Sequence, residues 1–237
     1  MENTDIKGII FDYGGTIDSR GVHWSEIIWD GYRSLNVPVD KEIFREAYVF
    51  AERELACTRH ILPHHTFADL LRIKMRIEFD RLVAEGHLPE GSTAIYADAV
   101  ADYCYDAARN AIADARPVLE ALYARFPMVL VSNFYGNVEA VLEDFDLRRY
   151  FRSIVESAVV GVRKPDPRIF ALGVDALGMK PEDVLVIGDS YKKDILPARS
   201  IGCHTAWLKG KGWTADEDAV EDASAILRLS EVLDVVF

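Results

Sequence analysis

Short apolar runs alternate with amphipathic stretches along this 237-residue chain, and the two patterns predict different elements. Runs of consecutive apolar residues, short enough for buried strands, occupy residues 6–12, 127–133, 184–189 and 204–208, with shorter candidates at 154–155 and 225–229. Apolar positions at helical spacing separate most of these runs. Strands that alternate with helices predict an α/β fold with a doubly wound parallel sheet.

Between the first two strands, by contrast, the pattern is helical for about ninety residues. Apolar side chains recur at three- and four-residue spacing, and Asp40 and Thr66 are predicted helix N-caps. One helix is expected to open at Ser92, and a separate helix from Pro117 to Phe126. We therefore predict an all-helical cap over residues 20–112. It is inserted into a Rossmann-like core that consists of residues 1–19 and 113–237.

The position of this insertion bears on function. It follows the first strand directly, at the carboxyl edge of the sheet, which is where ligands bind in open α/β folds. We expect the helical segment to act as a lid over that edge.

The charge composition of the chain argues against some classes of binding partner. The net charge is −12, from 39 acidic and 27 basic residues, and no block of Lys and Arg stands out. This argues against a nucleic-acid or anionic-membrane surface. An anionic substrate would therefore need a local positive site, built from a metal ion or a placed lysine. The oligomeric state is left open.

The three cysteines are scattered and form no C-x-x-C pair, which favours a reducing compartment over a disulfide framework. The acidic, polar stretch Met1–Asp5 does not resemble a signal peptide, and no apolar run approaches the roughly 18 residues of a membrane helix. A cytoplasmic location is expected.

Polar residues follow three of the predicted strands. Asp12 ends the first, Ser132 and Asn133 end the second, and Asp189 ends a later one, with Asp194 five residues on. Between them, Lys164 stands before a Pro-x-Pro turn that opens a helix. Taken singly, each has a structural alternative: a charge favoured by a helix dipole, a strand-end cap or a solvated loop lysine.

Taken together, these segments resemble the four motifs of the haloacid dehalogenase superfamily of hydrolases, which is dominated by phosphatases. The matching segments, in order, are Asp12-Tyr13-Gly14-Gly15-Thr16, Ser132, Lys164 and Gly188-Asp189-Ser190 with Asp194. The resemblance covers nearly the whole chain. The insertion is similar to the family's type 1 caps.

The resemblance implies a role for each motif residue. Asp12 would be the nucleophile and form an aspartyl-phosphate. Ser132 and Lys164 would hold phosphoryl oxygens, and Asn133 would orient the substrate or Asp12. Mg²⁺ is the implied cofactor, because it prefers oxygen ligands. Its ligands would be Asp12, the backbone carbonyl of Gly14, Asp189 and Asp194.

One position departs from the family pattern. Where its phosphatases carry a second Asp, which protonates the leaving group and later activates water, this chain has Gly14. Such a general acid/base typically contributes about 10²–10⁴-fold in rate. Both half-reactions are therefore expected to be slow.

Four functional readings stay open. The first is a slow Mg²⁺-dependent hydrolase of a small phosphorylated metabolite. The second is a hydrolase of a carbon–halogen or carbon–phosphorus bond. Asp189 and Asp194 argue against the halide version, and the phosphonate version needs a cap lysine, for which Lys41 and Lys74 are the candidates. The third is a non-hydrolytic phospholigand binder, and the fourth is a structural partner without a ligand.

Several cap residues have undecided roles. His60, His64 and His65 share one loop that is expected to face the crevice rather than to bind zinc, since it lacks a cysteine or acidic partner at suitable spacing. His23 and Trp24 are candidate crevice-lining residues. Tyr13 is expected to be a packing residue rather than an acid. No chemistry is assigned to Asp18 and Ser19.

Overall fold

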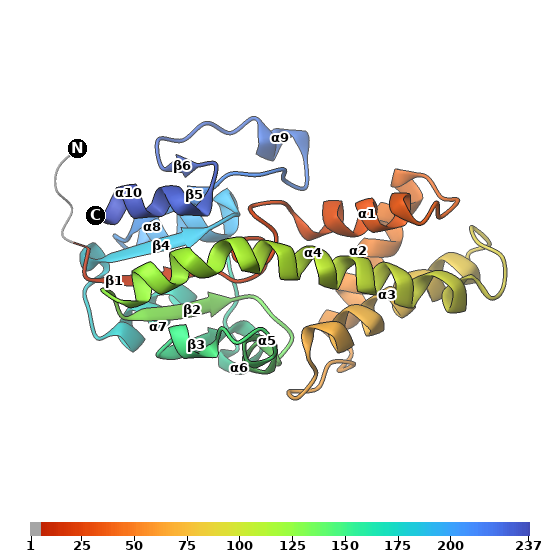
Figure 1. Ribbon diagram of the computed structural model, residues 1–237, viewed down its shortest axis with the longest axis horizontal. Coiled ribbons are helices and arrows are strands. Elements are labelled where there is room, and N and C mark those ends of the chain that lie inside the picture. Colours follow the sequence, from red (N-terminus) through yellow and green to blue (C-terminus); the bar gives the residue numbers. More distant parts are fainter. Residues whose placement is uncertain (1–5) are drawn as a thin grey trace.

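The computed structural model describes residues 6–237 and contains a six-stranded parallel sheet in the order β3-β2-β1-β4-β5-β6 (Figure 1). The strands are β1 (Gly8–Phe11), β2 (Met128–Ser132), β3 (Ser153–Glu156), β4 (Val184–Gly188), β5 (His204–Leu208) and β6 (Ala225–Ile226). This confirms the predicted fold class. Met1–Asp5, the stretch that does not resemble a signal peptide, lies outside the described residues.

Both faces of the sheet are buried, as the continuous apolar runs predict. Alternate residues of β1 belong to different core clusters: Ile9 and Phe11 to one, and Ile10 to the other. The surrounding helices are α5 (Val138–Asp144), α6 (Ser157–Val160), α7 (Arg168–Leu177), α8 (Leu196–Ser200), α9 (Ala215–Asp218) and α10 (Val232–Val236). Short helical turns are η1 (Arg148–Tyr150), η2 (Pro181–Asp183), η3 (Tyr191–Ile195) and η4 (Leu229–Glu231).

Four helices lie between β1 and β2: α1 (Trp24–Ser34), α2 (Lys41–Cys57), α3 (Phe67–Ala84) and α4 (Ser92–Tyr123). We refer to them as the helical insertion. The two predicted N-caps are confirmed. Asp40 accepts hydrogen bonds from the first turn of α2, and Thr66 forms a reciprocal capping box with Asp69 at the start of α3.

The helix α4 corrects the sequence-based expectation of two separate helices. It runs unbroken from Ser92 through Pro117 to Tyr123, and Figure 1 shows it extending from the insertion along the sheet. A proline in a helix interior costs about 3 kcal/mol. Burial of Val118, Leu119 and Leu122 outweighs this, since each large apolar side chain contributes about 1.5–3 kcal/mol. The helix α4 continues through residue 112 without a break, so no helix end marks the predicted domain boundary there. That boundary stays a prediction.

A second difference concerns the segment after β4. The sequence pattern of residues 194–201, followed by Gly202, predicts a single helix there. The chain instead first forms a π-helical turn, η3, and only then the helix α8. Pro197 lies in the first turn of α8, where its missing N–H is tolerated. The turn η3 places Asp194 next to the strand ends.

The sheet register places the candidate residues at one edge. Phe11 pairs with both Leu130 and Ile187, so β1, β2 and β4 end close together. Asp12 and Asp189 directly follow such ends, and Ser132 is the last residue of β2. Across residues 6–237, no helix combines the length and apolar character needed to cross a bilayer.

Candidate active site

A cavity of about 550 Å³ lies at the carboxyl edge of the sheet. Its walls come from two regions of the chain. Asp12, Ser132 and Lys164 line it from the sheet edge, while Glu52 and Lys74 line it from the helical insertion. Insertion and sheet edge therefore enclose one shared space.

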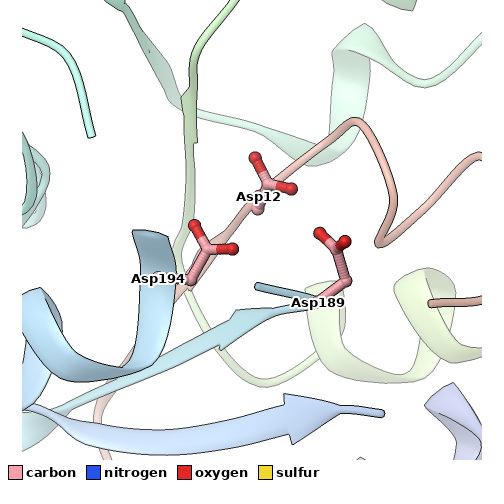
Figure 2. A group of neighbouring side chains, drawn as sticks. All are labelled: Asp12, Asp189 and Asp194. Atoms are coloured by element: carbon pink, nitrogen blue, oxygen red, sulfur yellow. The ribbon is translucent and has the colours of Figure 1, made fainter. Parts of the chain in front are cut away.

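Three carboxylates meet on the sheet side of this cavity. Asp12, Asp189 and Asp194 each offer an oxygen, and these oxygens lie within 4.8 Å of one another; no other such group of His, Cys, Asp or Glu occurs within residues 6–237. Figure 2 shows the three side chains turned toward a common space. Burial, then the neighbouring carboxylates, holds the pKa of Asp189 well above its usual value. Burial likewise raises the pKa of Asp194, against the lowering effect of Lys164.

Lys164 is the cation of this cluster. Its Nζ lies 2.5 Å from Oδ1 of Asp12 and 2.6 Å from Oδ1 of Asp194, and the side chain is buried. Burial alone would lower the pKa of Lys164, but the two carboxylates raise it above its ordinary value. One lysine against three carboxylates leaves an excess of negative charge, which is costly in a buried site without a further cation. Carboxylate oxygens are the donors that Mg²⁺ prefers, so these residues fit that ion.

Asn133 holds Lys164 in place. Its side-chain Nδ2 donates to the Lys164 carbonyl at 3.1 Å, and its Oδ1 accepts from the Lys164 N–H at 2.9 Å. The expected role of Asn133 was to orient the substrate or Asp12. The contacts connect the end of β2 to the lysine loop, and Asn133 also lines the cavity, so its role toward the substrate or Asp12 stays a prediction. The neighbouring Ser132 is buried at the cavity wall, as a phosphoryl contact requires.

Thr16 belongs to the motif segment that starts at Asp12, and the sequence assigns it no role. Its hydroxyl is within donor distance of both Asp12 Oδ2, at 3.1 Å, and Asp189 Oδ1, at 3.3 Å. Trp207 adds a further constraint, because its indole N–H donates to the Asp189 carbonyl at 2.7 Å. These donors fix two of the three carboxylates.

Gly14 and Gly15, which follow Asp12 and Tyr13, differ in how much room they leave for a side chain. Gly15 has a φ of +99°, and a Cβ there would lie 2.4 Å from the carboxylate of Asp189, so only glycine fits. A Cβ on Gly14 would meet no atom within 4 Å. Packing therefore does not demand glycine at position 14.

Asp18 is a site residue that sequence reasoning missed. It is 1% exposed, lines the cavity, and accepts hydrogen bonds from Gly15 N–H at 2.8 Å and Trp24 Nε1 at 3.1 Å. Burial raises its pKa to about 7. Nothing in the local sequence signals this, because the effect depends on burial by distant segments.

The insertion contributes a second ionic group. Lys74 on α3 pairs with Glu52 on α2, and Tyr135, in the loop after β2, donates its hydroxyl to Glu52. Lys41 instead pairs with Glu26 at 2.6 Å and does not line the cavity. Of the two lysines considered from the sequence, Lys74 is therefore the one at the site.

The other insertion candidates divide into two groups. His23 and Trp24 line the cavity, as expected. None of the histidines of the 60–65 loop does, so the expectation that this loop faces the crevice is wrong: His60 bonds Glu54 at 2.7 Å, and the carbonyl of His65 accepts from Asn137 at 2.9 Å. These contacts hold the loop against other parts of the surface.

Tyr13 behaves as a packing residue. It is fully buried and makes edge contacts with the rings of Phe67 and Phe134, which join the strand end to both the insertion and the β2 loop. Burial raises the pKa of its hydroxyl well above the usual value, which makes it a poor acid.

Comparison with known proteins adds a family match: residues 6–202 match the family model described as haloacid dehalogenase-like hydrolase. Haloacid dehalogenase-like hydrolase domain-containing protein 3 of Bos taurus is 37% identical over 83 residues, covering 35% of this chain and 33% of that protein. The glyceraldehyde 3-phosphate phosphatase of Pyrococcus furiosus is 33% identical over 93 residues, covering 38% and 39%. The matched region thus spans roughly a third of these relatives.

Similarity in structure extends further along the chain. The magnesium-bound HAD-hydrolase YfnB of Bacillus subtilis superposes with a TM-score of 0.60, at 18% identity, over 98% of both chains. At this identity the likeness concerns the fold.

Proposed function

Because the chain belongs to the haloacid dehalogenase-like hydrolase family, we propose that it is a Mg²⁺-dependent hydrolase of a small phosphorylated metabolite. The observation that carries the proposal is the cluster of Asp12, Asp189 and Asp194 around Lys164 at the floor of a cavity. Such a site supplies a nucleophile and positive charge for a phosphoester dianion. The helical insertion serves as the cap that closes the site.

The proposed metal ligands are the carboxylates of Asp12, Asp189 and Asp194 and the backbone carbonyl of Gly14. A bound Mg²⁺ would neutralise charge on the phosphoryl oxygens and lower their repulsion of the nucleophile. It would also compensate the negative charge of the carboxylates that Lys164 alone does not balance.

The residues divide the chemistry between them. A carboxylate oxygen of Asp12 attacks phosphorus while the bond to the leaving-group oxygen breaks, which gives an aspartyl-phosphate. Lys164 and the Ser132 hydroxyl hold phosphoryl oxygens. Water then cleaves the aspartyl-phosphate, which releases phosphate and restores Asp12. With Gly14 at the acid position, the leaving oxygen must take its proton from elsewhere, so activated leaving groups are favoured.

The phosphonate alternative loses support from the state of Lys74. An imine requires a neutral amine to attack a carbonyl, but Glu52 raises the pKa of Lys74 well above its usual value, against the lowering effect of burial. The amine is also engaged by that carboxylate. The halide alternative is disfavoured because Asp189 and Asp194 keep a cation site that carbon–halogen hydrolysis does not need.

The test is the substitution Gly14→Asp, assayed for phosphate release from monoesters with Mg²⁺. The new side chain enters open space, so folding should be retained. We expect a gain of about 10²–10⁴-fold, the usual contribution of a general acid/base. Asp12→Asn in the same background should abolish the gain.

Two other outcomes decide between readings. No turnover by either protein, with Mg²⁺-dependent binding of phosphate, would identify a non-hydrolytic phospholigand binder, the reading that the absence of a side chain at Gly14 favours. Equal and substantial turnover by both would mean that another group acts as the acid. Asp18, with its pKa of about 7, is then the first to substitute.

A further inference from the structure

We propose that Glu52 selects substrates whose leaving group ends in a hydrogen-bond donor, a hydroxyl or an ammonium group. This rests on the proposed phosphoester hydrolysis at Asp12. Glu52 and Asp12 line the same cavity, one from the insertion and one from the sheet edge. A phosphoryl group held at Asp12 therefore directs the rest of the molecule into the space that Glu52 borders.

The carboxylate of Glu52 is held in position by two partners. The hydroxyl of Tyr135 lies 3.1 and 3.2 Å from its two oxygens, and Lys74 pairs with Oε1. The side chain of Glu52 is 37% exposed, whereas that of Lys74 is 5% exposed. A ligand thus meets the carboxylate, and the ammonium stays covered.

The charge state of the pair makes Glu52 an acceptor. Burial would raise the pKa of Glu52, but Lys74 and Tyr135 lower it below its usual value. An ionised carboxylate has only acceptor sites, so the group it binds has to donate. The lowered pKa also makes Glu52 unsuited to replace the missing acid, which separates recognition from proton transfer.

Aromatic side chains and a neutral imidazole line the cavity wall beside Glu52. The rings of Tyr48 and Trp213 lie 5.5 Å apart, and His23 lies 5.3 Å from Trp213. Burial lowers the pKa of His23 to about 4, so it is neutral at pH 7. A leaving group that ends in a carboxylate would face Glu52 without access to the covered ammonium of Lys74, and it should be rejected.

The experiment uses the full chain with Asp12→Asn, in Mg²⁺, so that binding is measured without turnover. Calorimetry compares alkyl phosphates of equal length that end in hydroxyl, ammonium, methyl or carboxylate, with the chain length varied. At the best length, we expect the hydroxyl and ammonium esters to bind about 10- to 100-fold more tightly than the methyl and carboxylate esters, as for hydrogen bonds to charged groups. The difference in affinity between the hydroxyl and ammonium esters shows how far Lys74 neutralises the charge of Glu52.

The variant that tests the residue is Glu52→Leu combined with Lys74→Met, because removing one partner alone would leave a buried charge. We expect the preference for donor-ended esters to vanish, while inorganic phosphate binds as in the parent. Glu54→Gln, on the same helix but outside the cavity lining, should keep the preference. If the double variant is too unstable to assay, Glu52→Gln serves, because its amide oxygen still accepts a hydrogen bond from Lys74, and it should reduce the discrimination against the carboxylate ester.

Two results would overturn the inference. One is a parent that binds all four esters equally well, or that prefers the carboxylate ester; since the esters still bind, the phosphoester site would stand and only the role of Glu52 would fall. The other is a parent that binds neither inorganic phosphate nor any ester in Mg²⁺. That would refute the proposed function, and the inference with it.

Discussion

The two ends of the cavity each contain a buried lysine beside carboxylates, but their charge balance differs. At the sheet edge, Lys164 faces three carboxylates, two of them at ion-pair distance. In the insertion, Lys74 is paired with Glu52, and Glu78 lies one turn further along α3. The first cluster has two more carboxylates than lysines, and burial and mutual repulsion hold the pKa values of Asp189 and Asp194 above their usual values.

The insertion cluster reaches neutrality by another route. Glu78 is fully buried, and burial raises its pKa to about 8, so it is largely protonated at pH 7. Its Oε2 accepts from the Tyr32 hydroxyl at 3.2 Å. Lys74 and Glu52 then balance one another. The comparison teaches that unbalanced buried charge indicates a site for a cation, and that a balanced pair can serve recognition without one.

The largest expected effect follows from removing the single cation of the sheet-edge cluster. Lys164→Met leaves buried carboxylates unpaired, which costs about 3–5 kcal/mol of unfolding free energy in EDTA. Mg²⁺ should restore part of this loss. Chemical denaturation with and without Mg²⁺ measures both. The exposed Lys180→Met, outside the cavity lining, is the matched control and should change stability by less than about 0.5 kcal/mol. A Lys164 variant as stable as this control in EDTA would contradict the charge argument.

The next effect tests the cation directly. At a concentration about 100 times its dissociation constant, Mg²⁺ should stabilise the protein by about 2.7 kcal/mol. Asp189→Asn should weaken this response strongly while raising the stability of the metal-free protein, because it removes one repelling carboxylate. Glu52→Gln, at the balanced end, should leave the response unchanged. An Asp189 variant with the full Mg²⁺ response would exclude Asp189 as a ligand.

The insertion cluster predicts a pH effect. The pKa of Glu78 is about 8 when folded and ordinary, near 4.5, when unfolded, so between these values the folded state holds a proton that the unfolded state has released. Glu78 therefore contributes a loss of stability as pH rises through this window, by at most about 1.4 kcal/mol per pH unit.

Glu78→Gln should remove that contribution. The variant should gain stability relative to the parent as pH rises from 5 to 8, as followed by denaturation across this range. Glu46→Gln, on an exposed side chain of α2, should run parallel to the parent. A constant difference between Glu78→Gln and the parent would show that Glu78 is ionised in the folded state.

The smallest expected effect on stability comes from a helix cap of the insertion rather than from its charged residues. Thr66→Ala removes the side-chain half of the capping box at the start of α3 and should cost about 1 kcal/mol. The Mg²⁺ response should be unchanged, because the substitution leaves the sheet edge intact. Thermal denaturation with and without Mg²⁺ checks both statements, and an altered Mg²⁺ response would mean that the two ends of the cavity are coupled.

Much of the core was readable from local pattern. Continuous apolar runs identify the central strands, since strands buried on both faces need apolar side chains throughout. Asp12, Ser132 and Asp189 stand at strand ends in the sequence, and parallel pairing alone brings such ends to one edge. Asp40 and Thr66 could be recognised as caps because capping depends on neighbours within a few residues.

Other features have no local signal. The unbroken course of α4 through Pro117, the support of Lys164 by Asn133, and the pKa of Asp18 depend on segments far apart in the chain. The pairing of Lys74 with Glu52 depends on how α2 packs against α3. The sequence by itself determined the strands, the polar residues at their ends and the family resemblance, because these follow from periodicity and short motifs. Only the tertiary structure decided which charges are balanced, because desolvation and ion pairing arise from contacts between distant residues.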